Sequence, residues 1–164
     1  MEFDTTKLKP AHLKRIRSLA ALTEEQIGRF LPYVEFIQRK ANDLIFHEGD
    51  EADCLFLILT GRVRILSEKK RRRPYFLRYL DAGESLGEVG LIDGRPRSAS
   101  AEAFKDCLLL KIDREHFDKL MDEEPVLANQ FLLRLCTELG THLRDLTNRV
   151  GNDAQLREIV AFLQ

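Results

Sequence analysis

The chain has 164 residues, 44% of them hydrophobic and 32% charged, which is enough to bury the core of one soluble domain. Its 26 lysines and arginines nearly balance its 27 aspartates and glutamates, so no global field recruits nucleic acid or a membrane. No apolar run approaches the length of a membrane span, and the N-terminus lacks the apolar core of a signal peptide. We therefore expect a cytoplasmic protein.

The three cysteines, Cys54, Cys107 and Cys136, are odd in number and scattered through apolar patterns. A disulfide framework uses an even number of cysteines, and a zinc site uses closely spaced ones. We therefore expect three reduced thiols in the core.

Residues 1–33 are predicted to form helices that pack on the rest of the domain. Apolar residues recur between residues 8 and 21, which predicts a first helix. Thr23 and Gln26 have the spacing of a capping box, in which each side chain binds the backbone N–H of the other residue, and a second helix is expected to begin there. Pro32 is expected to end it.

Residues 34–112 change to short apolar or alternating segments separated by glycine turns, a pattern typical of β-strands. Strands at near-regular spacing predict an antiparallel double-sheet β jelly roll, whose mouth can hold one small ligand. With helices before and after it, the fold class is α+β. A basic run at 69–73 is expected to be a solvated hairpin tip, with a patch for nucleic acid or anionic lipid as the alternative. The predicted strands are 34–38, 44–46, 55–59, 63–65, 75–79, 98–103 and 108–112.

Residues 113–164 are predicted to form C-terminal helices that act as a lid or hinge. Asp113 can cap a first helix, and Pro125 can occupy the opening position of a second, long one. The segment from Pro125 to Val150 carries an apolar stripe over about half its circumference, more than the roughly 100° that one packing surface needs. We therefore expect it to contact the jelly roll and also a ligand or a second copy of the chain. His142 lies on this stripe, either as a packing residue or as a ligand contact.

Residues 86–101 contain the segment on which the function is expected to depend. Gly87 supplies a turn and Glu88 an acid, and a short apolar helical turn follows. The beginning of a helix offers unsatisfied N–H groups to an anion, and Arg97 can offer a planar fork to two phosphate oxygens. Glu88 suits such a site if the ligand also presents a hydroxyl group to its carboxylate. A sugar phosphate satisfies both requirements.

One motif in this segment, Gly87-Glu88-x-Gly90-Leu91-Ile92-x-Gly94-x-Pro96-Arg97-Ser98-Ala99, resembles the phosphate-binding cassette of cyclic nucleotide-binding domains. This family includes the catabolite activator protein, the regulatory subunit of protein kinase A and cyclic-nucleotide-gated channels. The resemblance extends from about Leu19 to Val150, and it implies a domain that binds cAMP or cGMP with no further cofactor and no metal. The ligand-binding residues that it implies are Gly87, Glu88, Val89, Gly90, Leu91, Arg97, Ser98, Ala99 and His142.

The resemblance also implies a role for each polar residue of the cassette (residues 86–101). Arg97 and nearby backbone N–H groups would hold the cyclic phosphate, and Glu88 would accept the ribose 2′-hydroxyl. Ser98 stands where cGMP-selective members usually carry threonine, so cAMP is expected to be preferred. The long helix would close over the base and, in some members, pairs two subunits, which makes a homodimer an option here. The helix residues best placed to reach the base are Leu139, His142 and Leu146.

An enzyme is not expected. A jelly roll also supports cupin metalloenzymes, which place two histidines close together and an acid further along the chain. The histidines of this chain lack that spacing, so a cupin-type metalloenzyme is only a remote alternative. These histidines are His12, His47, His116 and His142.

The preferred hypothesis is a cyclic-nucleotide-binding regulatory sensor domain that acts on another protein or domain. The alternative is a cAMP-responsive transcription regulator truncated before its DNA-binding part, because the chain ends at Gln164, before a helix-turn-helix could follow. Its tail, predicted as a helix at 156–163, has Arg157 as its only positive charge. We therefore expect this chain to bind neither nucleic acid nor a membrane by itself.

Overall fold

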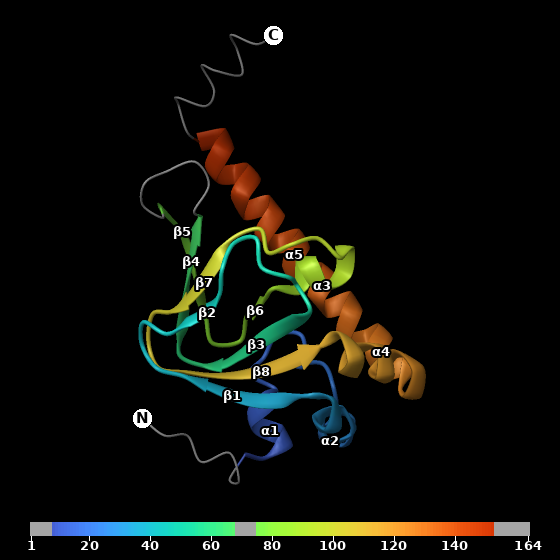
Figure 1. The fold of residues 1–164 in the computed structure, drawn as a ribbon. Helices are drawn as coiled ribbons and strands as arrows, with labels where there is room; N and C mark the ends of the chain where they lie inside the picture. Colours follow the sequence, from blue (N-terminus) through green and yellow to red (C-terminus); the bar gives the residue numbers. More distant parts are fainter. Residues whose placement is uncertain (1–7, 68–74, 153–164) are drawn as a thin grey trace.

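Two four-stranded antiparallel sheets form the centre of the computed structural model, which describes residues 8–67 and 75–152 (Figure 1). The strand order is β1-β8-β3-β6 in one sheet and β2-β7-β4-β5 in the other. The predicted α+β fold class, with its double-sheet jelly roll, is confirmed. The strands are β1 (Glu35–Arg39), β2 (Leu44–Phe46), β3 (Cys54–Thr60), β4 (Arg62–Ser67), β5 (Tyr75–Asp81), β6 (Ser85–Leu86), β7 (Ser100–Ala103) and β8 (Cys107–Asp113).

Helices precede and follow the sheets, and most of them begin where the sequence predicts. The Thr23 hydroxyl accepts from the Gln26 backbone N–H at 3.1 Å, and the Gln26 side chain accepts from the Thr23 N–H at 2.9 Å. The Asp113 carboxylate caps α4 by accepting from the His116 N–H at 2.9 Å, and Pro125 opens α5. The helices are α1 (Pro10–Leu13), α2 (Glu24–Phe30), the 3₁₀ turn η2 (Leu31–Tyr33), α3 (Glu88–Asp93), α4 (Arg114–Glu123) and α5 (Pro125–Asn152).

The predicted first helix over residues 8–21 is wrong, because only α1 is α-helical there. Leu13, Ile16, Leu19 and Leu22 follow one another at every third residue, and all four are buried. Each of the last three donates its backbone N–H to the carbonyl three residues earlier, at 3.0 Å. A spacing of three fits successive tight turns, whose side chains line up at i and i+3, better than the 3.6-residue period of an α-helix.

The central strands β3 and β8 are buried on both faces of their sheet. Leu55, Leu57 and Leu59 of β3 belong to the core cluster formed with the helices. Phe56 and Ile58, which alternate with them, belong to the cluster between the two sheets. Burial on both faces explains why these strands read as continuous apolar runs instead of an apolar–polar alternation.

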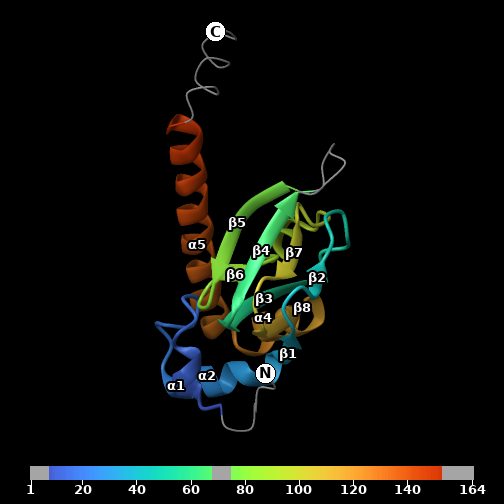
Figure 2. The same ribbon diagram turned by 90° about the vertical axis from the view of Figure 1, so that its left-hand side faces the viewer.

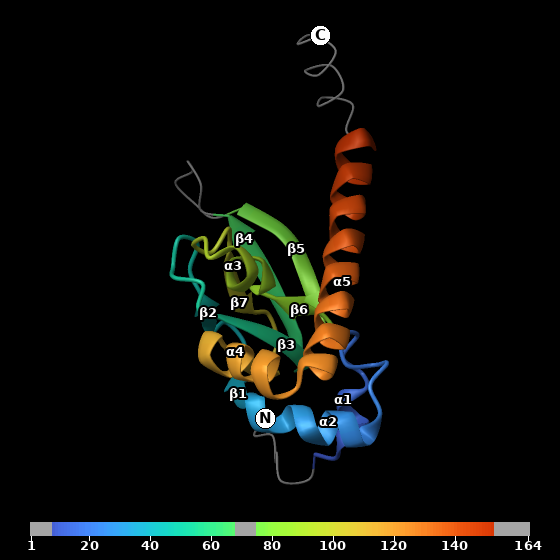
Figure 3. The ribbon, with the colours of Figure 1, turned by 90° about the vertical axis from the view of Figure 1, so that its right-hand side faces the viewer.

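α5 runs beside β5 and β6 and continues past the sheets (Figures 2 and 3). Its first half is anchored by apolar contacts, including Phe131, whose ring centroid lies 5.0 Å from that of Phe30. From Cys136 to Asp145, where every side chain is described, the buried residues are the polar Glu138 and His142, and Leu143 is 65% exposed. Between Leu135 and Asp145 the predicted apolar stripe is therefore interrupted by two buried polar residues; the side chains of Leu146 and Val150, which the prediction also placed on the stripe, lie outside what the structure describes.

Cys54 and Cys107 are buried free thiols, as predicted. Cys136 is exposed on α5, so its placement in the core was wrong: it follows the buried Leu135 and points away from the face that packs. Among the described residues, no helix is long and apolar enough to cross a bilayer, and no group of three or more histidine, cysteine or acidic side chains could hold a metal ion. The basic run at 69–73, the side chain of Leu146 and the predicted helix at 156–163 lie outside what the structure describes.

Candidate functional site

The cassette begins where β6 leaves the sheet and turns into α3. Leu86 pairs with Phe56 of β3, and Gly87 then adopts a φ of +80°, which only glycine takes up without strain. Gly87 and Gly90 also have no room for a side chain. A Cβ atom on Gly87 would lie 2.3 Å from Arg97 Nη1, and one on Gly90 would lie 2.2 Å from the Cβ of Ala52.

The backbone of Arg97 is fixed by the turn that follows β2. Its N–H donates to the carbonyl oxygen of Asp50 at 2.8 Å, and its own carbonyl accepts from the Gly49 N–H at 2.9 Å. This pair of hydrogen bonds joins the end of the cassette to a turn far away in the sequence. The side chain of Arg97 therefore starts from a fixed point on the frame.

The guanidinium of Arg97 is buried and held on three sides. Nη1 donates to the carbonyl oxygen of Gly87 at 2.9 Å, and Nη2 donates to the Cys54 Sγ at 3.1 Å. The Phe46 ring stacks on it, with its centroid 4.3 Å from Cζ, a favourable cation–π arrangement. Burial raises the pKa of the Cys54 thiol to about 11 although Arg97 acts in the opposite direction, so the thiol stays protonated at neutral pH.

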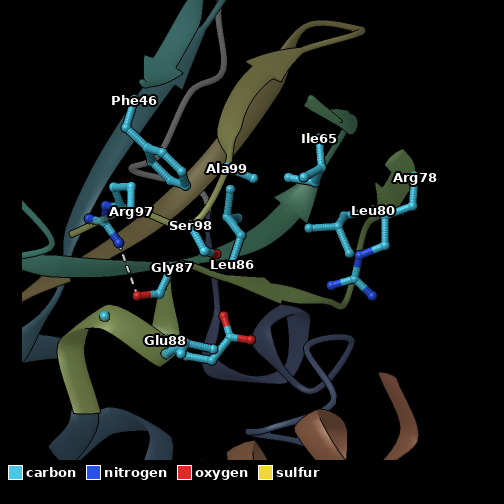
Figure 4. Close-up of a pocket in the computed structure, with 12 residues that line it drawn as sticks. Phe46, Ile65, Arg78, Leu80, Leu86, Gly87, Glu88, Arg97, Ser98 and Ala99 are labelled. Atoms are coloured by element: carbon cyan, nitrogen blue, oxygen red, sulfur yellow. Dashed lines mark hydrogen bonds between the residues drawn. The ribbon is translucent and has the colours of Figure 1, made fainter. Parts of the chain in front are cut away.

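A pocket opens between the cassette and the inner face of the second sheet, and it holds about 530 Å³ of space that is partly open to solvent. Figure 4 shows Arg97 and Phe46 at one end, Arg78 and Leu80 at the other, and Glu88 between the two ends. The remaining lining residues are Ile65, Leu86, Gly87, Val89, Gly90, Ser98 and Ala99.

Two charged groups of this pocket have buried atoms without a hydrogen-bond partner. Glu88 is 4% exposed, and neither its Oε2 nor the Nε of Arg97 has a partner in the structure. Buried charged atoms in folded proteins are normally paired, because an unpaired one loses its hydration without compensation. The pocket therefore offers one anionic acceptor and one cationic donor to a ligand that carries an anion and a hydroxyl group.

Seven of the nine residues predicted as ligand contacts line this pocket. Leu91 does not, since its side chain is fully buried in the core cluster formed with the helices. His142 does not line it either and instead contacts Arg78, which does, and Glu84, which does not. The seven lining residues are Gly87, Glu88, Val89, Gly90, Arg97, Ser98 and Ala99.

Five lining residues were not predicted as contacts: Leu86, which belongs to the cassette, and Phe46, Ile65, Arg78 and Leu80, which lie outside it. The four outside the cassette come from β2, β4 and β5, which approach it only through the fold. One signal was available in the sequence. Arg78 and Leu80 are two residues apart in a strand and so lie on the same face, and a charged residue on an inward face is unusual without a partner or a ligand.

The fold and the pocket together define a ligand-binding domain, and sequence comparison gives its class. The profile of the cyclic nucleotide-binding domain family matches residues 36–124, more than half of the chain. The chain belongs to the cyclic nucleotide-binding domain family.

Individual relatives carry the same segment within longer proteins. The lysophospholipase NTE1 of Chaetomium globosum is 34% identical over 118 residues, which are 72% of this chain and 8% of that protein. The cAMP-activated global transcriptional regulator CRP of Salmonella typhimurium is 28% identical over 135 residues, which are 82% of this chain and 62% of the regulator. The chain therefore spans less than two thirds of either relative.

Solved structures agree with this assignment. A cyclic nucleotide-binding domain from Methylobacillus flagellatus has a TM-score of 0.78 at 26% identity, covering 86% of this chain and 83% of that one. The catabolite activator protein of Thermus thermophilus has a TM-score of 0.70 at 29% identity, covering 82% of this chain and 62% of that one.

Proposed function

We propose that this chain is a regulatory sensor domain that binds one cyclic nucleotide beneath the cassette, with cAMP preferred over cGMP. One observation carries the proposal: Glu88 Oε2 and Arg97 Nε are both buried and both unpartnered in one pocket. A 3′,5′-cyclic nucleotide presents a phosphate anion next to a ribose 2′-hydroxyl. Arg97 would donate to the phosphate, and Glu88 would accept from the hydroxyl group.

The surroundings of Arg97 favour this role. Gly87, Cys54 and Phe46 hold the guanidinium in place before any ligand arrives, so little side-chain entropy is lost on binding. A hydrogen bond to a charged group contributes roughly 1.5–3 kcal/mol. The apolar wall formed by Ile65, Leu80 and Leu86 would cover the less polar parts of the nucleotide.

The preference for cAMP has weaker support than the ligand class. Ser98 lines the pocket where cGMP-selective relatives usually carry threonine, and the CRP relative is named for its activation by cAMP. A Xanthomonas campestris regulator, CLP, 27% identical with a TM-score of 0.71, is described as responsive to c-di-GMP. The cyclic dinucleotide is therefore the competitor to include in any test.

The output would be a movement of α5. Its first half is fixed in the core through Leu127, Phe131 and Leu135, whereas its second half meets the sheets through Glu138 and His142. A ligand with more contacts when this second half is docked shifts the equilibrium by its difference in affinity for the two states. The exposed apolar residues of α5 would be available for a homodimer, and we expect the sensor to act in the cytoplasm.

A cAMP-responsive transcription regulator is the second candidate, as part of a longer protein with a DNA-binding domain. The similarity to CRP over 82% of this chain favours it. Both candidates use the pocket in the same way and differ in what α5 acts on.

Calorimetric titration of the protein with cAMP, cGMP and c-di-GMP tests the proposal. We expect one nucleotide per chain, and cAMP bound at least tenfold more tightly than cGMP. A tenfold preference for cGMP would refute the cAMP assignment. Binding of c-di-GMP alone, or no binding of any of the three, would refute the proposed ligand.

A further inference from the structure

Arg78 belongs to the pocket wall and to the α5 interface at the same time. It lies on β5, and its side chain lines the pocket on the side opposite Arg97 (Figure 4). Its Nη2 is 3.2 Å from Nδ1 of His142. His142 is 8% exposed on α5 and does not itself line the pocket. Arg78 is thus a direct physical link between the space a ligand occupies and the helix.

The contact gives Nδ1 of His142 the role of acceptor. A guanidinium carries N–H donors and no acceptor, so Nδ1 of His142 must accept the hydrogen bond from Arg78. A neutral imidazole then keeps its one proton on Nε2, which is 3.4 Å from Glu84 Oε1 and donates to it. A doubly protonated ring would instead direct an N–H at the guanidinium. His142 therefore lies between a cation and a carboxylate.

Glu84 holds the ring nitrogen of His142 that does not face Arg78. Its Oε2 accepts from the Asp81 backbone N–H at 2.7 Å, and its Oε1 lies 3.3 Å from Arg17 Nη1. Burial raises the pKa of Glu84, but the hydrogen bonds from His142 and Asp81 and the charge of Arg17 outweigh it, and the net effect is a lowered pKa. The carboxylate is ionised at neutral pH and anchors His142 in one orientation.

We propose that Arg78 is the positioning residue through which a ligand in the pocket strengthens the docking of α5, with Nδ1 of His142 as the acceptor that it holds. The identity of the ligand rests on the proposed function. The guanidinium has five N–H donors, so it can bind an acceptor of the nucleotide while Nη2 stays on His142. The Arg78 side chain loses conformational entropy when it holds His142. A ligand that has already immobilised Arg78 reduces this entropy cost.

Linkage makes this proposal quantitative. If the ligand strengthens helix docking by some factor, an intact docking contact strengthens ligand binding by the same factor. A change at His142, outside the pocket, must therefore weaken ligand binding, and it must do so only while Arg78 is present.

A double-mutant cycle measured by calorimetry with cAMP tests the link. His142→Phe is expected to weaken cAMP binding at least fivefold in the wild-type background and less than twofold in the Arg78→Gln background. His142→Asn, whose amide oxygen can replace the Nδ1 acceptor, is expected to stay within twofold of wild type and shows that the site tolerates substitution. Arg144→Gln removes a charge from an exposed position of α5 and is expected to change nothing.

Hydrogen exchange supplies a second readout. cAMP is expected to raise protection over residues 138–145 of the wild type and to leave it unchanged in Arg78→Gln. Equal losses from His142→Phe in both backgrounds would overturn the link while leaving the proposed function intact.

Absence of cAMP and cGMP binding to the wild type would overturn the proposed function instead. The link is then tested without any ligand, by NMR of the His142 ring nitrogens. A proton on Nε2 and none on Nδ1 supports it, and a proton on Nδ1 overturns it.

Discussion

Arg97 binds the first glycine of the cassette: Nη1 of Arg97 donates to the carbonyl oxygen of Gly87 at 2.9 Å. The two residues stand on either side of α3, and Gly87 both turns the chain, at a φ of +80°, and leaves the space that the guanidinium occupies. The backbone turn and the placement of the arginine therefore depend on each other.

Gly87→Ala should damage both stability and binding. A left-handed conformation costs a residue with a Cβ roughly 1–2 kcal/mol, and the new methyl group would displace Arg97. We expect a loss of about 1–3 kcal/mol of unfolding free energy in urea and at least a tenfold loss of cAMP affinity. Gly94→Ala is the control, because Gly94 has a φ of +70° but no atom within 4 Å of its added Cβ. It should lose stability and keep its affinity, and an equal loss of affinity in both variants would contradict the account.

Glu88→Gln should reveal what the carboxylate binds. The amide preserves the size of the side chain but removes the charge that strengthens a hydrogen bond to a hydroxyl group. We expect cAMP affinity to fall at least tenfold, and the affinity for 2′-deoxy-cAMP, which lacks that hydroxyl group, to change less than threefold. Titration of both proteins with both ligands gives the answer. Equal losses for the two ligands would mean that Glu88 acts by supporting the cassette and not by contact with the ribose.

Glu138→Gln should stabilise the protein at neutral pH. Burial raises the pKa of Glu138, and the hydrogen bond from Ser85 at 3.0 Å opposes part of this rise. A carboxyl group whose pKa is raised by folding binds its proton more tightly in the folded state than in the unfolded state. Its contribution to stability therefore falls as the pH rises from the ordinary pKa of 4.5 through the raised pKa of the folded state. Each unit of that shift corresponds to about 1.4 kcal/mol.

Thermal unfolding of both proteins from pH 4 to pH 8 measures this effect. The variant should have the higher Tm at pH 7, and the difference should shrink toward pH 4. A Tm difference that does not depend on pH would show that burial does not raise the pKa of Glu138.

The cysteines should react in the order of their burial. Cys54 and Cys107 are buried, and burial raises the pKa of both thiols, whereas Cys136 is exposed. Because the thiolate is the reactive species, we expect iodoacetamide at pH 7.5 to alkylate Cys136 in the native protein and the other two only after denaturation. Peptide mass mapping detects each site, and rapid native labelling of Cys54 would contradict its place behind Arg97.

Local signals in the sequence predicted local structure well. The capping pair Thr23 and Gln26, the cap Asp113 and the opening residue Pro125 each depend on neighbours a few residues away, and all are confirmed. The segment after Leu13 was misread because an apolar residue at every third position is close to a helical period, and only the observed chain of turns distinguishes the two. β6 was missed because two residues carry no periodicity.

The site was predicted only where its residues are close together in the sequence. The cassette supplies a turn, an acid and an arginine in one stretch, and eight of its residues line the pocket. Arg78 was missed because its presence in the pocket depends on the packing of one sheet against the other. The same limit applies to His142, which shares a helical face with apolar residues but binds Arg78 and Glu84.

The affinity of an Arg97 variant for cAMP tests the central claim most directly. We expect Arg97→Ala to weaken binding a hundredfold or more, because a bidentate, charge-assisted contact to the phosphate is lost. Arg97→Lys should recover only part of this loss, since a lysine cannot reproduce the fork. Arg95→Ala, two residues away with a side chain 84% exposed, is the matched control and should bind like wild type. A folded Arg97→Ala protein that binds cAMP with wild-type affinity would contradict the account.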